Sequence, residues 1–178
     1  MRVFPRYTVS LVIVCLAAAM LSACGKKIIL PEYESAKDQY LFALRLKTNT
    51  VKGFDEKSRA QQLKRIESSF LRVIEKFPDD TKYTPAAYIN LANTYNDYRE
   101  PAKAVKYFQI ALKKYPGQED IQIFGHYGLG SAYDRLGRYK EAKEQFKLCV
   151  DKFGDDPRSA YQEIVEKARR RYTRIREE

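Results

Sequence analysis

Residues 104–116 read AVKYFQIALKKYP, and the same pattern occurs 38 residues earlier, as IESSFLRVIEKFP at 66–78, and 38 residues later, as AKEQFKLCVDKFG at 142–154. Each copy has a phenylalanine four positions after its first residue and a helix-breaking Pro or Gly at its end. The apolar positions are spaced as on one face of a helix. A period of 20–50 residues indicates stacked helical or stranded units, because one unit cannot bury its apolar face alone.

A second helical pattern precedes the last two copies. Four of its positions recur with the same 38-residue spacing: Tyr88, Leu91, Ala92 and Tyr95 become His126, Leu129, Gly130 and Tyr133. Each unit is therefore predicted to be a pair of antiparallel helices. The predicted helices cover about 32–46, 55–77, 85–98, 101–115, 121–136 and 139–153, with a loop at 47–54.

Three residues mark expected helix ends. Asp55 is suited to cap the second helix, Pro101 suits a first helical turn, and Gly137 suits a helix end. Pro157 is expected to open a final helix. We expect that helix to cover the end of the stack through an apolar line made of Ile164, Ala168, Tyr172 and Ile175.

The repeat resembles the tetratricopeptide repeat, whose motif is W-x2-L-G-x2-Y followed by A-x3-F, a small residue and P. The match is strong at 85–118 and 123–156, where Tyr88 and His126 take the Trp place, and partial at 33–80. The period exceeds the family's 34 by four residues. The resemblance implies an all-α, tetratricopeptide-type helical-hairpin solenoid over residues 32–178, with about three repeats and a C-terminal capping helix.

The same resemblance implies that the first helix of each pair lines a concave face that binds a peptide or helix of a partner protein. The motif positions that point inward in the family fall here on Ala86, Ile89, Asn93, Asn96 and Asp97 in one unit, and on Phe124, Tyr127, Ser131, Asp134 and Arg135 in the next. For any one of these residues the alternative is a solvated inner face. Ile89 stands where the family's carboxylate-binding Lys would be, so capture of an acidic C-terminus is not expected.

The amino terminus carries an export signal. Arg2 and Arg6 precede an apolar stretch from Val9 to Leu21, too short to span a membrane, and the small residues of Leu21-Ser22-Ala23-Cys24 follow. This predicts a signal peptide at 1–23. The ending resembles the bacterial lipoprotein box, which implies cleavage before Cys24, acylation of Cys24 and a short tether at 24–31. The alternative is an ordinary secretory signal that contains a cysteine.

The resemblance also implies a location. Gly25, rather than Asp, follows the cysteine. In some bacteria Asp at this position retains lipoproteins at the inner membrane, so we expect lipid anchoring to the outer membrane of a two-membrane cell, facing the periplasm.

Residues for chemistry are scarce. His126 is the only histidine, and Cys149 is the only cysteine outside the signal and the lipidation position. Both occupy apolar repeat positions, where packing is the simpler role. Gly125, Gly128 and Gly130 lie inside a predicted helix, which favours close helix packing over a phosphate loop. We therefore expect no enzyme activity, metal, cofactor or small-molecule substrate.

The chain is basic, with 33 Lys and Arg against 23 Asp and Glu and a net charge of +10. Basic residues gather at the ends of the mature chain: Lys26 and Lys27 near the anchor, and Arg169, Arg170, Arg171, Arg174 and Arg176 in the last helix. This excess is either a solvated helix face or an attraction for anionic headgroups, acidic polymers or an acidic partner. Nucleic acid is not expected, because the export signal removes the chain from it.

Two functions remain open. The first is a lipid-anchored scaffold or adaptor in an envelope complex, because the combination resembles the tetratricopeptide lipoproteins of outer-membrane protein assembly. The second is an accessory binding protein for cell-wall enzymes or anionic wall polymer.

Overall fold

The computed structural model of the chain describes residues 30–49 and 55–175. The predicted signal peptide, Cys24, most of the predicted tether and positions 50–54 of the expected loop lie outside the described residues. The chain divides into two units, Met1–Pro31 and Glu32–Glu178, and the second holds every helix described below.

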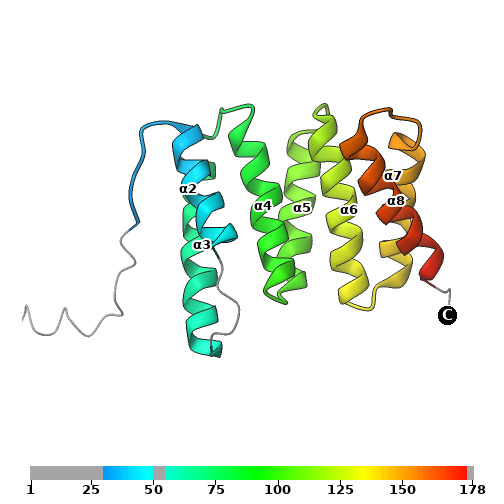
Figure 1. Ribbon diagram of the computed structural model, residues 1–178, viewed down its shortest axis with the longest axis horizontal. Helices are drawn as coiled ribbons and strands as arrows, with labels where there is room; N and C mark the ends of the chain where they lie inside the picture. The colour runs from blue at the N-terminus through cyan, green and yellow to red at the C-terminus, as the bar shows by residue number, and fades with distance from the viewer. Residues whose placement is uncertain (1–29, 50–54, 176–178) are drawn as a thin grey trace, which may run out of the picture. The chain divides into compact units, whose positions relative to one another are not determined.

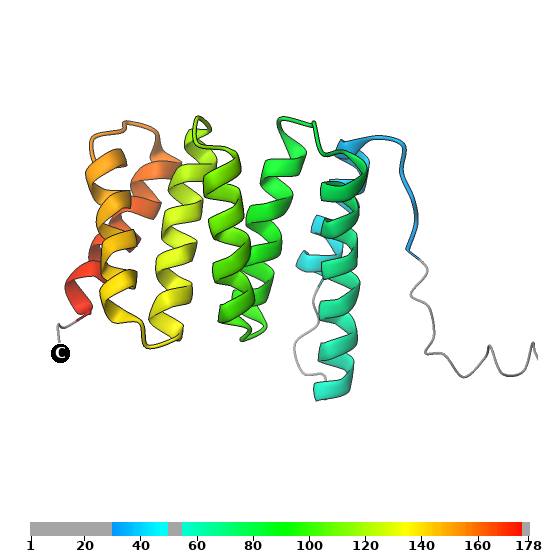
Figure 2. The same ribbon diagram turned by 180° about the vertical axis from the view of Figure 1, so that it is seen from behind.

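The second unit is built from helices alone over its described residues (Figure 1). They form three hairpins and one further helix, in the order α2 Ala36–Thr48, α3 Glu56–Lys76, α4 Tyr83–Asp97, α5 Pro101–Lys114, α6 Glu119–Arg135, α7 Tyr139–Phe153 and α8 Ser159–Arg174. Each helix packs against the next along the chain, as Figures 1 and 2 show from opposite sides. This arrangement confirms the predicted helical-hairpin solenoid with its capping helix.

Local capping sets several helix ends. The Asp55 side chain accepts from the Ser58 amide at 3.1 Å, and Pro101 is the first residue of α5, as predicted. The first helix was predicted from residue 32, which is wrong by four residues. The Ser35 side chain accepts from the Asp38 amide at 3.1 Å, so α2 begins at Ala36 and runs on to Thr48.

The turns inside the second and third hairpins have the same conformation. Gly137 has a φ of 71°, and Arg99, at the matching position 38 residues earlier, has a φ of 63°. In each turn the next residue's amide bonds back to the matching tyrosine carbonyl, from Arg138 to Tyr133 at 3.0 Å and from Glu100 to Tyr95 at 2.8 Å. Gly137 adopts this left-handed conformation without the steric cost that Arg99 bears.

The repeated apolar positions form the core. The second helices bury the same three positions completely: Ile66, Phe70 and Val73 in α3, Ala104, Phe108 and Ala111 in α5, and Ala142, Phe146 and Cys149 in α7. The glycines of α6 give the phenylalanine rings room. A Cβ on Gly128 would lie 2.2 Å from Phe108 Cζ, and one on Gly130 would lie 2.8 Å from Phe146 Cε1. The prediction of close packing is confirmed.

The last helix covers the stack through the predicted residues and two more. Its buried residues are Tyr161, Val165, Ala168 and, just after its end, Ile175, while Ile164 and Tyr172 are only partly buried. All four predicted residues therefore pack against the core, but the prediction omitted Tyr161 and Val165, which are more deeply buried than Ile164 and Tyr172. Arg158 lies between Pro157 and Ser159, the first residue of α8, so the helix begins two positions after the residue that was predicted to open it.

Candidate functional site

The first helices form one face of the solenoid. α4 packs against both α2 and α6, and α6 packs against α8, whereas α3, α5 and α7 do not pack against one another. The two layers can be followed in Figures 1 and 2. Because the first helices lie closer to one another than the second helices do, the stack curves toward the first helices. This inner face is the surface expected to meet a partner.

Four predicted groove residues of α4 fall into two groups, one buried against α6 and one accessible to solvent. In α4, Ile89 and Asn96 are each only 6 % exposed, because α6 packs over them. Asn96 Nδ2 donates to the carbonyl oxygen of Gly128 in α6 at 3.3 Å, so this amide joins two helices. Asn93 is half-buried and Asp97 is exposed. Only the last two are available to a partner in this structure.

The matching positions of α6 behave in the same way. Tyr127 is half-buried and its ring centroid lies 5.8 Å from that of Phe146. The Asp134 carboxylate accepts from Arg171 at 2.8 Å and from Arg174 at 3.2 Å, both on α8. Asp134 therefore holds the last helix, and Tyr127 packs within its own hairpin. Two matching pairs of repeat positions, 89 with 127 and 96 with 134, are thus used for contacts between helices.

The remaining predicted residues lie along the open part of the inner face. Ser131 is partly exposed and its hydroxyl donates to the Tyr127 carbonyl at 3.0 Å. Arg135 is exposed, and Phe124 is partly buried against the core. Positions 93 and 131 are therefore partly exposed and positions 97 and 135 are exposed, and together they offer an amide, a hydroxyl and two opposite charges.

The structure adds a polar network that the sequence did not reveal. Lys47 Nζ, at the end of α2, donates to Asn90 Oδ1 at 3.2 Å, and Asn90 Nδ2 donates to the Tyr40 hydroxyl at 2.9 Å. Burial lowers the pKa of Lys47, with Asp97 opposing the change, and burial raises the pKa of Tyr40. Lys47 had been assigned to a loop. If the predicted helix had been extended by one turn, Lys47 would have lain on the same helix face as Tyr40, which is seven residues earlier.

The basic end of the chain is partly neutralised within the molecule. Arg171 and Arg174 pair with Asp134, and Arg169 lies 3.6 Å from Glu166. Arg170 is exposed, and Arg176 lies outside the described residues. Part of the arginine excess therefore fixes α8 in place.

The residues with potential chemistry have packing roles. Burial raises the pKa of the Cys149 thiol to about 12, so little of it is in the reactive thiolate form at neutral pH. His126 is partly buried, and its Nδ1 donates to Gln145 Oε1 at 2.9 Å. Within 30–49 and 55–175, no group of His, Cys, Asp and Glu side chains is arranged to hold a metal ion. None of the helices described there is long and apolar enough to cross a membrane.

Burial of His126 makes stability depend on pH. Burial lowers the pKa of its imidazole, with Lys152 adding to the effect. The unfolded chain then binds the proton more readily, so this contribution is complete above about pH 6.5 and is lost as the pH falls through the lower folded pKa. We expect the free energy of unfolding, measured by urea denaturation, to fall more between pH 7.5 and 5.5 in the wild type than in His126→Gln. Equal losses in both proteins would exclude His126 as the cause.

Two parts of the chain match models of the tetratricopeptide repeat, at residues 86–117 and 125–151. These parts are the α4–α5 hairpin and most of the α6–α7 hairpin. No curated protein matches the chain. Repeats of this type indicate a protein–protein interaction scaffold, and they point to protein partners.

Proposed function

We propose that this chain, an all-α solenoid that carries tetratricopeptide repeats, is a non-catalytic, lipid-anchored scaffold or adaptor that binds a partner protein in a bacterial envelope complex. The combination of the repeat and the lipoprotein box resembles the tetratricopeptide lipoproteins of outer-membrane protein assembly, so we propose that process. The mature chain begins at an acylated Cys24 and is held at the outer membrane, facing the periplasm.

One observation carries the binding role. The inner face carries Asn93 and Asp97 on α4 and Ser131 and Arg135 on α6, and these two helices pack against each other. These residues supply donors, acceptors and both charge signs, and the partly buried ring of Phe124 lies on the same helix as Ser131 and Arg135. Such a surface suits the backbone and side chains of an extended peptide or of a helix from a partner.

The lipid anchor rests on the sequence at the amino terminus. Leu21-Ser22-Ala23-Cys24 follows an apolar stretch of signal-peptide length, and a tether of seven residues from Gly25 to Pro31 reaches at most about 25 Å. A domain tethered so closely works near the membrane surface. This proximity supports a role within an envelope complex over one in free solution.

The inner face can be tested without disturbing the fold. Asn93→Ala, Asp97→Ala and Arg135→Ala together remove one partly exposed and two exposed side chains, whereas Tyr127→Ala would also remove packing against Phe146. We expect this inner-face variant to recover at least tenfold less partner from crosslinked envelopes, equivalent to about 1.4 kcal/mol or more. Its thermal midpoint should stay within a few degrees of the wild type.

A matched variant on the second helices provides the control. Lys64→Ala, Lys106→Ala and Lys113→Ala also remove three exposed polar side chains, and they should leave partner recovery unchanged. Equal recovery with both triple variants would move the binding site off the inner face. Recovery of cell-wall enzymes or anionic glycan, in place of barrel-assembly proteins, would instead favour the accessory cell-wall function.

A further inference from the structure

Of the two residues in left-handed turns, one carries a side chain and the other does not. Arg99 has a φ of 63° between α4 and α5, and Gly137 has a φ of 71° at the matching position between α6 and α7. A Cβ on Gly137 would meet nothing within 4 Å beyond its chain neighbours, so only the backbone conformation opposes a side chain there. Arg99 carries that backbone cost, which a glycine at the same position would remove.

The hydrogen bonds of the turn do not require an arginine. The Arg99 amide donates to the Asn96 carbonyl at 3.2 Å, and the Glu100 amide donates to the Tyr95 carbonyl at 2.8 Å. Both are backbone contacts that any residue able to adopt this conformation would make. Arg99 is exposed, and in the described part of the chain its guanidinium forms no hydrogen bond, ion pair or aromatic contact. The described contacts of this side chain therefore do not offset the strained backbone.

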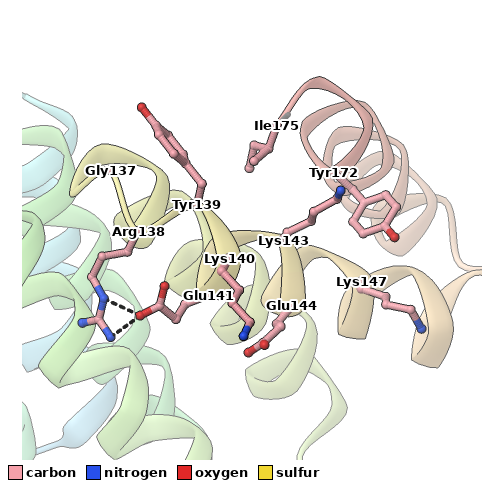
Figure 3. A pocket seen from close by; sticks show the side chains of 10 residues that line it. All are labelled: Gly137, Arg138, Tyr139, Lys140, Glu141, Lys143, Glu144, Lys147, Tyr172 and Ile175. Atoms are coloured by element: carbon pink, nitrogen blue, oxygen red, sulfur yellow. Dashed lines mark hydrogen bonds and ion pairs between the residues drawn. The ribbon is translucent and has the colours of Figure 1, made fainter. Parts of the chain in front are cut away.

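The nearest carboxylate is already used by another cation. Glu100 is paired with Lys103 at 2.5 Å, within the first turn of α5. Figure 3 shows the equivalent pair in the turn that contains Gly137, where Arg138 and Glu141 are 2.6 Å apart. The residue that follows each left-handed position thus pairs within its own helix. Glu100 is therefore not available to the preceding arginine.

A second arginine binds at the same turn. Arg59 Nη2 of α3 donates to the Asp97 carbonyl oxygen at 3.2 Å, and its guanidinium lies 5.3 Å from the Tyr98 ring centre. The Asp97 carboxylate acts on Lys47, whose pKa it raises against the effect of burial. Arg99 adds a further positive charge to this turn, and like charges oppose each other. Backbone and charge both disfavour an arginine here unless an anion from outside binds it.

The turn lies at the edge of the inner face. Asp97 is the last residue of α4 and an exposed inner-face residue, and Arg99 follows two residues later, so their Cα atoms are at most about 7 Å apart. A segment bound over Asn93 and Asp97 is therefore within reach of the Arg99 side chain. Arg135, at the position of α6 that matches Asp97, is also exposed and forms no ion pair with the described residues. This edge thus offers two arginines to the carboxylates of a partner.

We propose that Arg99 is a partner-binding residue, whose guanidinium binds a carboxylate side chain of the protein segment that occupies the inner face. The left-handed backbone sets this side chain at the edge of the groove, and the bound protein supplies the acidic group. This role rests on the proposed inner-face function. It adds a binding residue outside the motif positions and an acidic residue that the partner carries. Arginine suits this role because its planar fork binds a carboxylate with defined geometry.

Arg99→Gly separates a binding role from a structural one. We expect Arg99→Gly to recover at least fivefold less partner from crosslinked envelopes, because the charged contact is lost. Its thermal midpoint should equal or exceed that of the wild type, since glycine adopts the left-handed conformation without strain. Arg99→Glu should recover no more than Arg99→Gly, because it opposes an acidic partner. Wild-type recovery in Arg99→Gly would overturn the proposal, as would a midpoint that falls together with recovery.

Zero-length crosslinking identifies the group that binds at this position. In Arg99→Lys, a water-soluble carbodiimide joins the introduced amine to a carboxylate in contact with it, and peptide mass spectrometry locates the bond. We expect an amide between position 99 and an Asp or Glu side chain of a partner protein. Absence of this amide would contradict the proposal. A bond only to Asp97 or Glu100 of the same chain, or to a glycan carboxylate, would contradict it as well.

Two controls separate this role from the proposed function. Gly137→Ala adds a Cβ to the matching turn, so it should lower the thermal midpoint and leave partner recovery unchanged. An unchanged midpoint would show that the conformation costs nothing, and would overturn the assignment of Arg99. If the inner-face variant loses the partner and Arg99→Gly does not, the assignment of Arg99 fails and the inner face remains the binding site. If neither variant loses the partner, both proposals fail.

Discussion

Phe108→Ala should lower the free energy of unfolding by about 3–5 kcal/mol, the cost of removing a fully buried aromatic ring from a packed core. Phe108 has no exposed surface, and its ring occupies the space that Gly128 leaves open on α6. Because the helices are held apart by their other contacts, they cannot close fully over the gap. Urea denaturation followed by circular dichroism would measure the loss.

An exposed aromatic residue gives the control for this prediction. Tyr139 at the start of α7 is 42 % exposed, so Tyr139→Ala should change the unfolding free energy much less, by about 0.5 kcal/mol. A second check uses the glycine opposite the ring. Gly128→Ala should destabilise the wild type through overlap with Phe108, and less so in Phe108→Leu, where the side chain is smaller. Equal effects of Phe108→Ala and Tyr139→Ala would contradict the assigned helix register.

Cys24→Ser should release the protein from membranes. The proposed anchor consists of acyl chains on this one residue, each buried CH₂ contributes about 0.8 kcal/mol, and two or more chains give stable binding. We expect the membrane-bound fraction to fall more than tenfold in Cys24→Ser after a high-salt wash. The unlipidated chain should also change its mobility in gel electrophoresis. Density-gradient fractionation of the wild type should place it with outer-membrane markers.

Cys149→Ser is the matched control for the anchor. It replaces the same atom type at a buried position of α7, so it should affect stability and leave membrane binding unchanged. A Cys24→Ser protein that still sediments with membranes, at unchanged mobility, would exclude lipidation. Wild-type protein that fractionates with inner-membrane markers would exclude the outer-membrane location alone.

The inner face shows how far motif positions predict a site. The motif placed Ile89, Asn96, Tyr127 and Asp134 on the surface that meets a partner, and the structure uses them between helices. Each first helix packs against the first helix of the next hairpin, which covers part of the face that carries the motif positions. Asn93, Asp97, Ser131 and Arg135 lie outside that part and remain accessible. The motif gives helix faces, but the packing angle between successive hairpins decides which part of a face stays open.

The sequence alone determined the helical hairpins, their period and most of their ends, because these depend on local spacing, capping and helix breakers. The 38-residue recurrence of Phe70, Phe108 and Phe146 was sufficient to place each second helix in the core. Only the tertiary structure decided how Lys47 meets Asn90, how Asp134 binds α8, and why Tyr172 is left partly uncovered. These features join residues 37 or more positions apart, or depend on which of the described helices pack against α8, and no local pattern specifies the distance between two helices.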